Sequence, residues 1–268
     1  MLHRLYVPGR PVADFVEHLW LVRGDVPGTQ RQMLLPDGGL VLIFNLGEPQ
    51  RLCERADTRQ HSVFRASWVS GQQPQPIVIQ QGGRYHLLGI RFRPGGAFPL
   101  FRFPVAELTG RVVEFSDVWG AEADRVREQL GDARTEDDQL RRLEGWLAQR
   151  LQQVTLDPRI RFAAEALQRG GTGVGRLAEL TGISGKHLTQ QFERHVGLTP
   201  KLFGRVQRLQ RTFAHVGTRA EVDWTDTAFA GGYYDQAHLI REFRELIGLT
   251  PTEYLTRRSP YLGYLNVA

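Results

Sequence analysis

Polar side chains recur at helical spacing in two stretches of the C-terminal half, opposite an apolar stripe in each. In a helix predicted over 184–195, the apolar Leu188 and Phe192 leave a polar face opposite. In a second helix predicted over 235–247, the apolar set is Leu239, Phe243 and Leu246. The side chains left over are Lys186, Thr189, Gln190 and Glu193 in the first helix, and Gln236, Ala237, Ile240, Arg241 and Arg244 in the second.

The chemistry of these left-over side chains suits the major groove of DNA. Lysine and arginine match the acceptors of guanine, glutamine matches adenine, and the methyl groups of Ile240 match the methyl group of thymine. A good bidentate contact discriminates between bases by roughly 1–3 kcal/mol. For each of these residues the alternative is an ordinary solvated helix face.

The two helices belong to an internal repeat. Gly-Leu-Thr-Pro occurs at 197–200 and again at 248–251, an offset of 51 residues. Upstream, Gly182 matches Gly232 at an offset of 50, so the second copy has gained one residue in its turn. A length change confined to a turn is typical of a tolerated loop insertion. The other positions that match are His187 with His238, Leu188 with Leu239, and Phe192 with Phe243.

Each copy predicts a short helix, a glycine turn and a longer helix, which is the plan of a helix-turn-helix unit. A helical repeat that builds a scaffold without binding DNA is the alternative. The expected core of the first unit is Leu177, Ala178, Ile183, Leu188 and Phe192. The expected core of the second unit is Ala228, Phe229, Tyr233, Leu239 and Phe243.

Seven helices and no strand are predicted after Pro158. Ser184, Thr199, Asp223, Asp235 and Thr250 stand where a side chain can cap a helix N-terminus. The predicted helices cover 159–168, 174–181, 184–195, 200–216, 223–230, 235–247 and 251–257.

The helix predicted over 200–216 joins the two units. Its 17 residues span about 25 Å at 1.5 Å per residue, and successive major grooves repeat at about 34 Å. With the offset of each unit added, this spacer places both recognition helices in successive grooves. Arg205, Arg208 and Arg211 recur at every third position of this helix. They either contact phosphates or form a solvated stripe.

The repeat resembles the DNA-binding domain of AraC/XylS-type transcriptional regulators. The resemblance covers roughly 159–258 and is carried by "GISGKHLTQQFERHVGLTPKLF" and "AFAGGYYDQAHLIREFRELIGLTPTEYL". It implies two helix-turn-helix units joined by one long helix, and base contacts from the first two turns of each recognition helix. Tyr233, Ala237 and Leu255 depart from the usual residues, and Leu255 removes one possible phosphate contact. We expect double-stranded DNA and RNA polymerase as partners and activation as the outcome.

The first half is rich in predicted strands. Runs at 40–44, 63–69, 77–80 and 85–92 are separated by glycine, proline and polar stretches, which favours a barrel or sandwich. This half resembles the cupin-like domain that precedes such DNA-binding units, and "LLGIRFRPGGAFPLF" with "ELTGRVVEFSDVWG" resembles an uncharacterised subgroup. The whole chain is therefore expected to be an α+β protein of two domains, with a β-rich sensor at 1–120, a helical linker or dimerisation segment at 121–157, and the DNA-binding domain at 158–260.

A helix in the middle segment has an apolar stripe made of Leu140, Leu143, Leu147, Leu151 and Val154. This stripe either packs on its own domain or forms a helix–helix contact in a homodimer.

A small-molecule effector is expected at the mouth of the β-rich domain, where barrels bind ligands. The aromatic and polar residues on or beside the predicted strands are Trp20, Trp68, Tyr85, His86 and Arg91. For each of them the alternative is ordinary packing or an ordinary surface charge.

A metal-dependent cupin-type enzyme tethered to DNA is the competing function. Such enzymes need clustered histidine and carboxylate ligands, whereas the histidines of the first half are scattered. We therefore expect no cofactor, no metal and no enzyme. Stoichiometric iron, manganese or zinc in the purified protein would favour the enzyme.

Composition is consistent with a protein of the cytoplasm. The net charge of +5 comes entirely from residues 159–268, which have 15 basic and 10 acidic side chains, and this favours a polyanionic partner. The longest apolar run, at 40–44, is too short to cross a membrane. A single cysteine, Cys53, excludes an internal disulfide framework.

Overall fold

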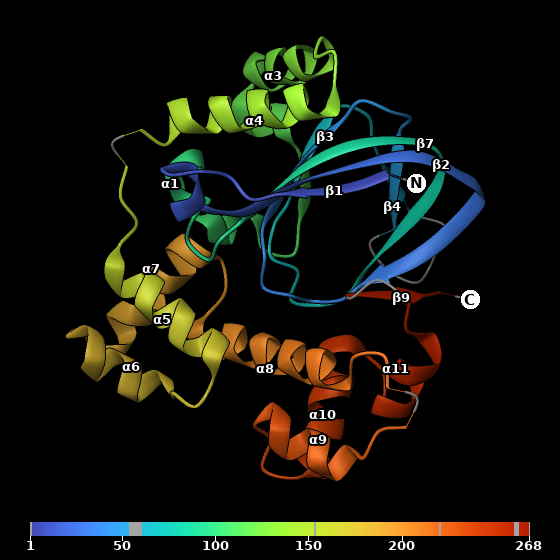
Figure 1. Ribbon diagram of the computed structural model, residues 1–268. Helices are drawn as coiled ribbons and strands as arrows, with labels where there is room; N and C mark the ends of the chain where they lie inside the picture. Colours follow the sequence, from blue (N-terminus) through green and yellow to red (C-terminus); the bar gives the residue numbers. More distant parts are fainter. Residues whose placement is uncertain (1, 54–60, 153, 220, 260–262, 268) are drawn as a thin grey trace.

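The computed structural model describes residues 2–53, 61–152, 154–219, 221–259 and 263–267. Figure 1 shows a bent β-sheet with helices on one side, and a second group of helices that lies below the sheet. The fold is thus the expected α+β arrangement of two domains. The helices of the first domain are α1 (Phe98–Phe101), α2 (Phe115–Trp119), α3 (Ala121–Gly131) and α4 (Glu136–Arg150).

Two long antiparallel strands form the spine of the sheet. β2 (Val16–Leu34) pairs with β7 (Ile77–Phe92) along almost its whole length, with a bulge between Val26 and Thr29. The strand order is β1-β2-β7-β3-β6-β8, so in the described residues the sheet is open rather than a closed barrel. The other strands are β1 (Leu2–Tyr6), β3 (Val41–Asn45), β4 (Gln50–Cys53), β5 (His61–Phe64), β6 (Ser67–Ser70), β8 (Val112–Glu114) and β9 (Tyr264–Asn266).

The strands differ from the expected ones where glycine and proline occur inside them. β2 was not predicted; it contains Gly24, Pro27 and Gly28, and a bulge between Val26 and Thr29 lets the strand continue past them. Likewise, 77–80 and 85–92 form the single strand β7, which runs through Gly83 at a φ of 75°. The run at 63–69 is instead split into β5 and β6.

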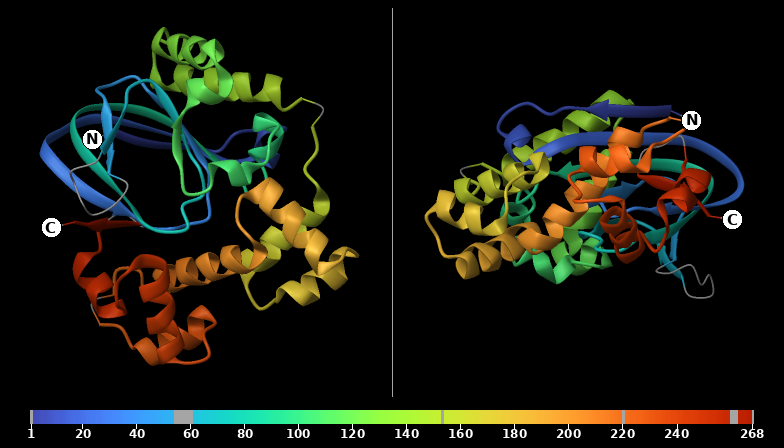
Figure 2. Two further views of the ribbon diagram at one scale, coloured as in Figure 1. Left: turned by 180° about the vertical axis from the view of Figure 1, so that it is seen from behind. Right: turned by 90° about the horizontal axis from the view of Figure 1, so that it is seen from below.

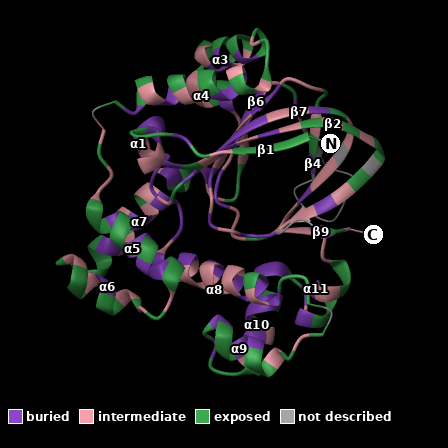
Figure 3. Ribbon diagram, in the orientation of Figure 1, coloured by how far each residue is buried: buried purple, intermediate pink, exposed green. Residues whose placement is uncertain are grey.

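The core of the first domain lies between one face of the sheet and helices α1–α4. Leu140, Leu143, Leu147 and Leu151 are all buried in it together with Phe44 and Leu88 of the sheet. The apolar stripe of the middle segment therefore packs on its own domain, which leaves no leucine seam for a dimer. Figure 3 shows that the exposed positions of α3 and α4 face outward.

The second domain contains the seven expected helices. Ser184, Thr199, Asp223, Asp235 and Thr250 each cap a helix with the side chain, as predicted. The helices are α5 (Pro158–Arg169), α6 (Val174–Thr181), α7 (Gly185–Val196), α8 (Pro200–Val216), α9 (Trp224–Gly231), α10 (Gln236–Ile247) and α11 (Pro251–Arg257).

Each helix-turn-helix unit has its own small core. Leu177, Leu188 and Phe192 are buried in the first unit, and Ala228, Tyr233, Leu239 and Phe243 in the second. Phe229 was wrongly expected in the second core: 62% of it is exposed, because α9 turns the preceding Ala228 inward. The expectation of no strand after Pro158 was also wrong, since β9 pairs with β2.

The two domains are in contact along α8. Gln207 Nε2 donates to the backbone oxygen of Asp37 at 2.9 Å, and Gln210 Nε2 donates to that of Pro36 at 2.7 Å. At the first unit, the Phe98 ring lies 4.1 Å from the His195 ring. At the second unit, the left view of Figure 2 shows the C-terminal segment reaching the N-terminal sheet, where β9 adds to β2.

Candidate nucleic-acid interface

The recognition helix of the first unit is α7, and its first two turns project polar groups. Gly182, at a φ of 69°, ends α6 and permits the turn into α7. The Ser184 hydroxyl accepts from the His187 amide at 3.2 Å and so fixes the start of the helix. Lys186 and Gln190 are exposed, whereas Thr189 and Glu193 are half-buried. All four lie on the side away from the buried Leu188 and Phe192.

The recognition helix of the second unit is α10, and it has the same construction. Gly232, at a φ of 83°, ends α9, and the Asp235 carboxylate accepts from the His238 amide at 2.7 Å. The residues expected to face DNA here are mostly accessible: Gln236, Ala237, Arg241 and Arg244 are exposed, and Ile240 is half-buried.

Helix α8 holds the two units by aromatic packing near each end. Phe203, in its first turn, lies edge-on to Phe192 of α7, with the ring centroids 5.4 Å apart. Phe213, near its last turn, lies 5.7 Å from Phe243 of α10 and stacks on Tyr254 of α11 at 4.6 Å. Because both contacts are buried, the separation of the units depends on the length of α8.

Arg205, one of the three arginines of α8 that were candidates for contact with DNA, bridges two helices of the protein instead. Its guanidinium forms ion pairs with Glu242, at 2.6 Å, and with Glu245, both on α10. Burial by itself lowers the pKa of Arg205, but the two carboxylates outweigh this effect and raise it. A phosphate would have to compete with both carboxylates.

The sequence reasoning missed Glu242 and Glu245 as partners of Arg205. Glu242 is a buried charge in the middle of α10, beside the buried Phe243. A carboxylate at a core position of a helix is the signal that calls for a cationic partner.

The other two arginines of α8 differ from each other. Arg211 Nη1 donates to the backbone oxygens of Leu167, at 3.3 Å, and of Gln168, at 2.8 Å. The Arg208 guanidinium lies over the Tyr233 ring, 5.3 Å from its centroid. Within the described residues, no carboxylate pairs with Arg208.

A groove of about 880 Å³ runs along α8 between the two units. We call it the inter-unit groove. Its walls are the α5–α6 turn on one side and the start of α10 on the other. The charged residues that line it are Lys201, Arg205, Arg208, Arg211, Asp235, Arg241, Glu242 and Glu245.

Four of the five residues proposed for the effector lie on one face of the sheet. Trp20 pairs with Gly89 across β2 and β7, Gly89 pairs with Ile43, and Ile43 pairs with Trp68. Directly paired residues share a face, and so do alternate residues of β7, which adds Tyr85 and Arg91. The Trp20 ring covers Gly89 so closely that no Cβ would fit there.

The fifth residue, His86, points to the opposite face, because odd and even positions of a strand alternate. Its Nε2 lies 3.0 Å from the side-chain oxygen of Gln139 on α4. His86 therefore belongs to the contact with α4, away from the other four residues. This placement does not support its role in an effector site.

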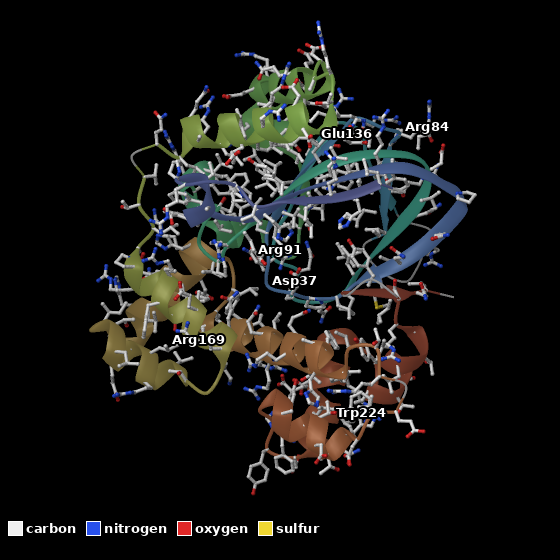
Figure 4. The ribbon with its side chains drawn as sticks, in the orientation of Figure 1. Asp37, Arg84, Arg91, Glu136, Arg169 and Trp224 are labelled. Atoms are coloured by element: carbon white, nitrogen blue, oxygen red, sulfur yellow. The ribbon has the colours of Figure 1, made fainter. Side chains whose placement is uncertain are left out.

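Arg91 connects this face of the sheet to the boundary between the domains. Its guanidinium pairs with Asp37 at 2.6 Å and Glu17 at 3.2 Å, and Figure 4 shows Arg91 and Asp37 between the sheet and α8. Burial alone lowers the pKa of Arg91, but the two carboxylates raise it overall. The backbone oxygen of Asp37 is the acceptor for Gln207 of α8.

Tyr85 and Trp68 are packed rather than open. The Tyr85 hydroxyl accepts from the Gly82 amide at 2.9 Å, and burial raises the pKa of Tyr85 to about 12. Trp68 packs on Phe64, with 5.5 Å between the ring centroids.

Two kinds of feature are absent from the described part of the chain. No group of three or more His, Cys, Asp or Glu residues is arranged to hold a metal ion. No helix is long and apolar enough to cross a membrane.

Comparison with known families gives two matches. Residues 4–114 match the family described as "Domain of unknown function (DUF6597)", and residues 177–257 match the family "Helix-turn-helix domain". The second match covers both units and the helix that joins them. The C-terminal domain is an AraC-type helix-turn-helix domain. This AraC-type domain makes the chain a DNA-binding transcriptional regulator.

Two solved structures show detectable similarity to this chain. ToxT from Vibrio cholerae is 10% identical, with a TM-score of 0.44 over 89% of this chain and 97% of that chain. The C-terminal domain of the response regulator AraT from Geobacillus stearothermophilus is 22% identical, with a TM-score of 0.36 over 40% of this chain and 93% of that chain.

A third similar structure is a probable AraC family transcriptional regulator from Rhodopseudomonas palustris. It is 25% identical, with a TM-score of 0.33 over 37% of this chain and 96% of that chain. A comparison with curated proteins finds no match.

Proposed function

We propose that each protomer reads a specific DNA sequence by inserting α7 and α10 into successive major grooves. The observation that supports this most strongly is the pairing of two like units, each with an accessible polar recognition helix, on opposite ends of α8. The 17 residues of α8 span about 25 Å, to which the width of each unit adds. The resulting separation of α7 and α10 is of the same order as the roughly 34 Å between successive major grooves.

The proposed base-reading residues are the exposed ones at the start of each recognition helix. Lys186 and Gln190 do this in α7, and Gln236 and Arg241 in α10. Thr189 and Glu193 in α7, and Ala237, Ile240 and Arg244 in α10, complete the two contact surfaces. Arg205 belongs to the scaffold in this proposal, because its charge is already paired.

Replacement of Arg241 by alanine tests the proposal. A bidentate contact with guanine is worth roughly 1–3 kcal/mol of discrimination, so the full-length variant should bind a selected duplex roughly 5- to 150-fold more weakly. Its affinity for random DNA should change far less. The measurement is a binding titration with a duplex enriched from a randomised pool.

Arg84→Ala provides the matched control, since Arg84 is an exposed arginine on the β-rich domain. Figure 4 shows Arg84 at the far side of the sheet from the helix-turn-helix units. Equal losses for Arg241→Ala on selected and random DNA would show that Arg241 anchors phosphate and does not read bases.

We further propose that the β-rich domain is a non-catalytic regulatory domain that responds to a small-molecule effector. Support comes from Arg91, which shares a sheet face with Trp20, Trp68 and Tyr85 and pairs with Asp37 at the contact with α8. A ligand that competes for Arg91 would disturb that contact. RNA polymerase is the proposed protein partner in activation. A homodimer, if one forms, needs a surface other than the buried leucines of α4.

A further inference from the structure

The inter-unit groove has an excess of positive charge and lies between the α5–α6 turn of the first unit and the recognition helix α10 of the second. Its five cationic side chains face three carboxylates, which leaves a net charge of +2. The net charge is concentrated in a concave surface, where low-dielectric walls strengthen the attraction for an anion.

The groove opens on the side of α8 that the first domain does not use. Lys201, Arg205 and Arg208 follow one another at intervals of four and three residues, so they share one side of the helix. Gln207 and Gln210, which bind the first domain, lie on another side. The groove is therefore accessible while the two domains are in contact.

The geometry of DNA determines what this groove meets. Two helices in successive major grooves on one side of a duplex are separated by one minor groove and the two phosphate backbones at its edges. The surface of the protein between the two units must face those backbones. The part of that surface that lies along α8, between the α5–α6 turn and α10, is the inter-unit groove.

Apart from Arg241, which is proposed to read bases, Lys201 and Arg208 are the cations of the groove that remain available to a phosphate. Arg205 is paired with Glu242 and Glu245, and Arg211 donates to two backbone oxygens. Lys201 is exposed, and in the described part of the chain neither it nor Arg208 has a carboxylate partner. The Tyr233 ring holds the Arg208 guanidinium in place, which reduces the entropy lost on binding.

The charge of Arg208 also affects Arg211, the next arginine along α8. Burial lowers the pKa of Arg211, and the charge of Arg208 lowers it further. An anion bound beside these two guanidinium groups would offset their repulsion.

We propose that the inter-unit groove binds the phosphate backbone of DNA at the centre of the operator, with Lys201 and Arg208 as the phosphate ligands. This inference rests on the proposed insertion of α7 and α10 into successive grooves. It assigns to the groove a sequence-independent share of the affinity, separate from the base contacts of the recognition helices. Arg205 is a positioning residue here, since it holds α10 against α8 beside the groove.

The test measures binding of the full-length protein to a selected duplex at several salt concentrations. Each phosphate contact contributes about 0.9 to the slope of log Kd against log salt. We expect Lys201→Gln and Arg208→Gln each to reduce this slope by about 0.9 and to weaken selected and random duplexes by the same factor. Arg84→Gln, which makes the same change of net charge on the far domain, should leave the slope unchanged.

Ethylation of single phosphates locates the contact. Ethyl groups on the central phosphates should block binding of the natural protein and interfere much less with the two variants. Lys201 is exposed, so Lys201→Gln should fold normally even if Arg208→Gln disturbs the packing of Tyr233. An unchanged salt slope in Lys201→Gln and in a folded Arg208→Gln, or interference confined to the two half-sites, would overturn the proposal.

The same experiments separate this proposal from the proposed function. If no sequence is enriched from the randomised pool, specific reading fails, and the slopes on random duplex still report on the groove. If Arg241→Ala loses selectivity but the two groove variants keep the full slope, specific reading stands and the groove proposal fails.

Discussion

At the scale of the residue, α7 and α10 depend on single polar side chains at their N-termini. Asp235 accepts from the His238 amide and Ser184 from the His187 amide. Each cap fixes the first turn of a recognition helix, which is the turn whose side chains are proposed to read bases. Both caps follow from the sequence alone, because only short polar residues at this place can accept a backbone N–H.

Replacing Asp235 with alanine should therefore destabilise the second unit. The loss of an N-cap costs about 1 kcal/mol, so the unfolding midpoint in urea should fall, and affinity for DNA should fall with it. Asp235→Asn keeps a good capping group and should retain most of the stability. A variant with asparagine that is as unstable as the one with alanine would show that the charge of Asp235, and not its hydrogen bond, is what matters.

At the scale of the element, the two ends of α8 are fixed by different means. The first end packs on α7 through Phe203 and Phe192. The second end adds the ion pair of Arg205 with Glu242 to the aromatic contact between Phe213 and Phe243. The sequence placed Arg205 on α8 correctly, but periodicity does not show which other helix a side chain meets.

Removing the Arg205 side chain should be costly because it leaves Glu242 buried without a partner. We expect Arg205→Met to lower the free energy of unfolding by roughly 2 kcal/mol, less than the 3–5 kcal/mol of a fully buried pair, since a quarter of the Arg205 side chain is exposed. The double variant Arg205→Met with Glu242→Met should recover most of this loss, which urea unfolding measures. No recovery in the double variant would mean that the pair contributes packing and not charge compensation.

At the scale of the whole molecule, the C-terminal segment ties the two domains together. β9 pairs with β2, and Leu265 is only 1% exposed in the core of the second unit, next to Leu35 of the first domain. The backbone amide of Leu35 also donates a hydrogen bond to the backbone oxygen of Gly263 at 2.9 Å. The contact therefore joins residues more than two hundred positions apart in the sequence.

Leu265→Ala should weaken this connection between the domains. Truncation of a buried leucine costs about 2–5 kcal/mol, so we expect a lower unfolding midpoint and a larger radius of gyration in X-ray scattering. Asn266→Ala is the matched control, because Asn266 is exposed on the same strand. A radius of gyration that stays the same in Leu265→Ala would show that α8 and the loop at Pro36 and Asp37 suffice to hold the domains.

Sequence reasoning was most successful where the structure is local. The helices of the second domain, their caps and the glycine turns follow from spacing and from the backbone needs of single residues, which neighbours in the chain satisfy. The same reasoning missed β2, which contains Pro27 and Gly28 and continues past them through a bulge. It missed β9, because three residues have too weak a pattern to predict a strand whose partner is far away in the sequence.

The sequence by itself determined that two like helix-turn-helix units are joined by one helix, because that information is written in a repeat and in helical periodicity. Only the tertiary structure decided which charges are already paired. Arg205, Arg208 and Arg211 are equivalent by spacing, yet one forms ion pairs, one stacks on a ring and one binds backbone oxygens. The physical reason is that an ion pair depends on distances of a few ångströms between helices, which packing sets and the order of residues does not reveal.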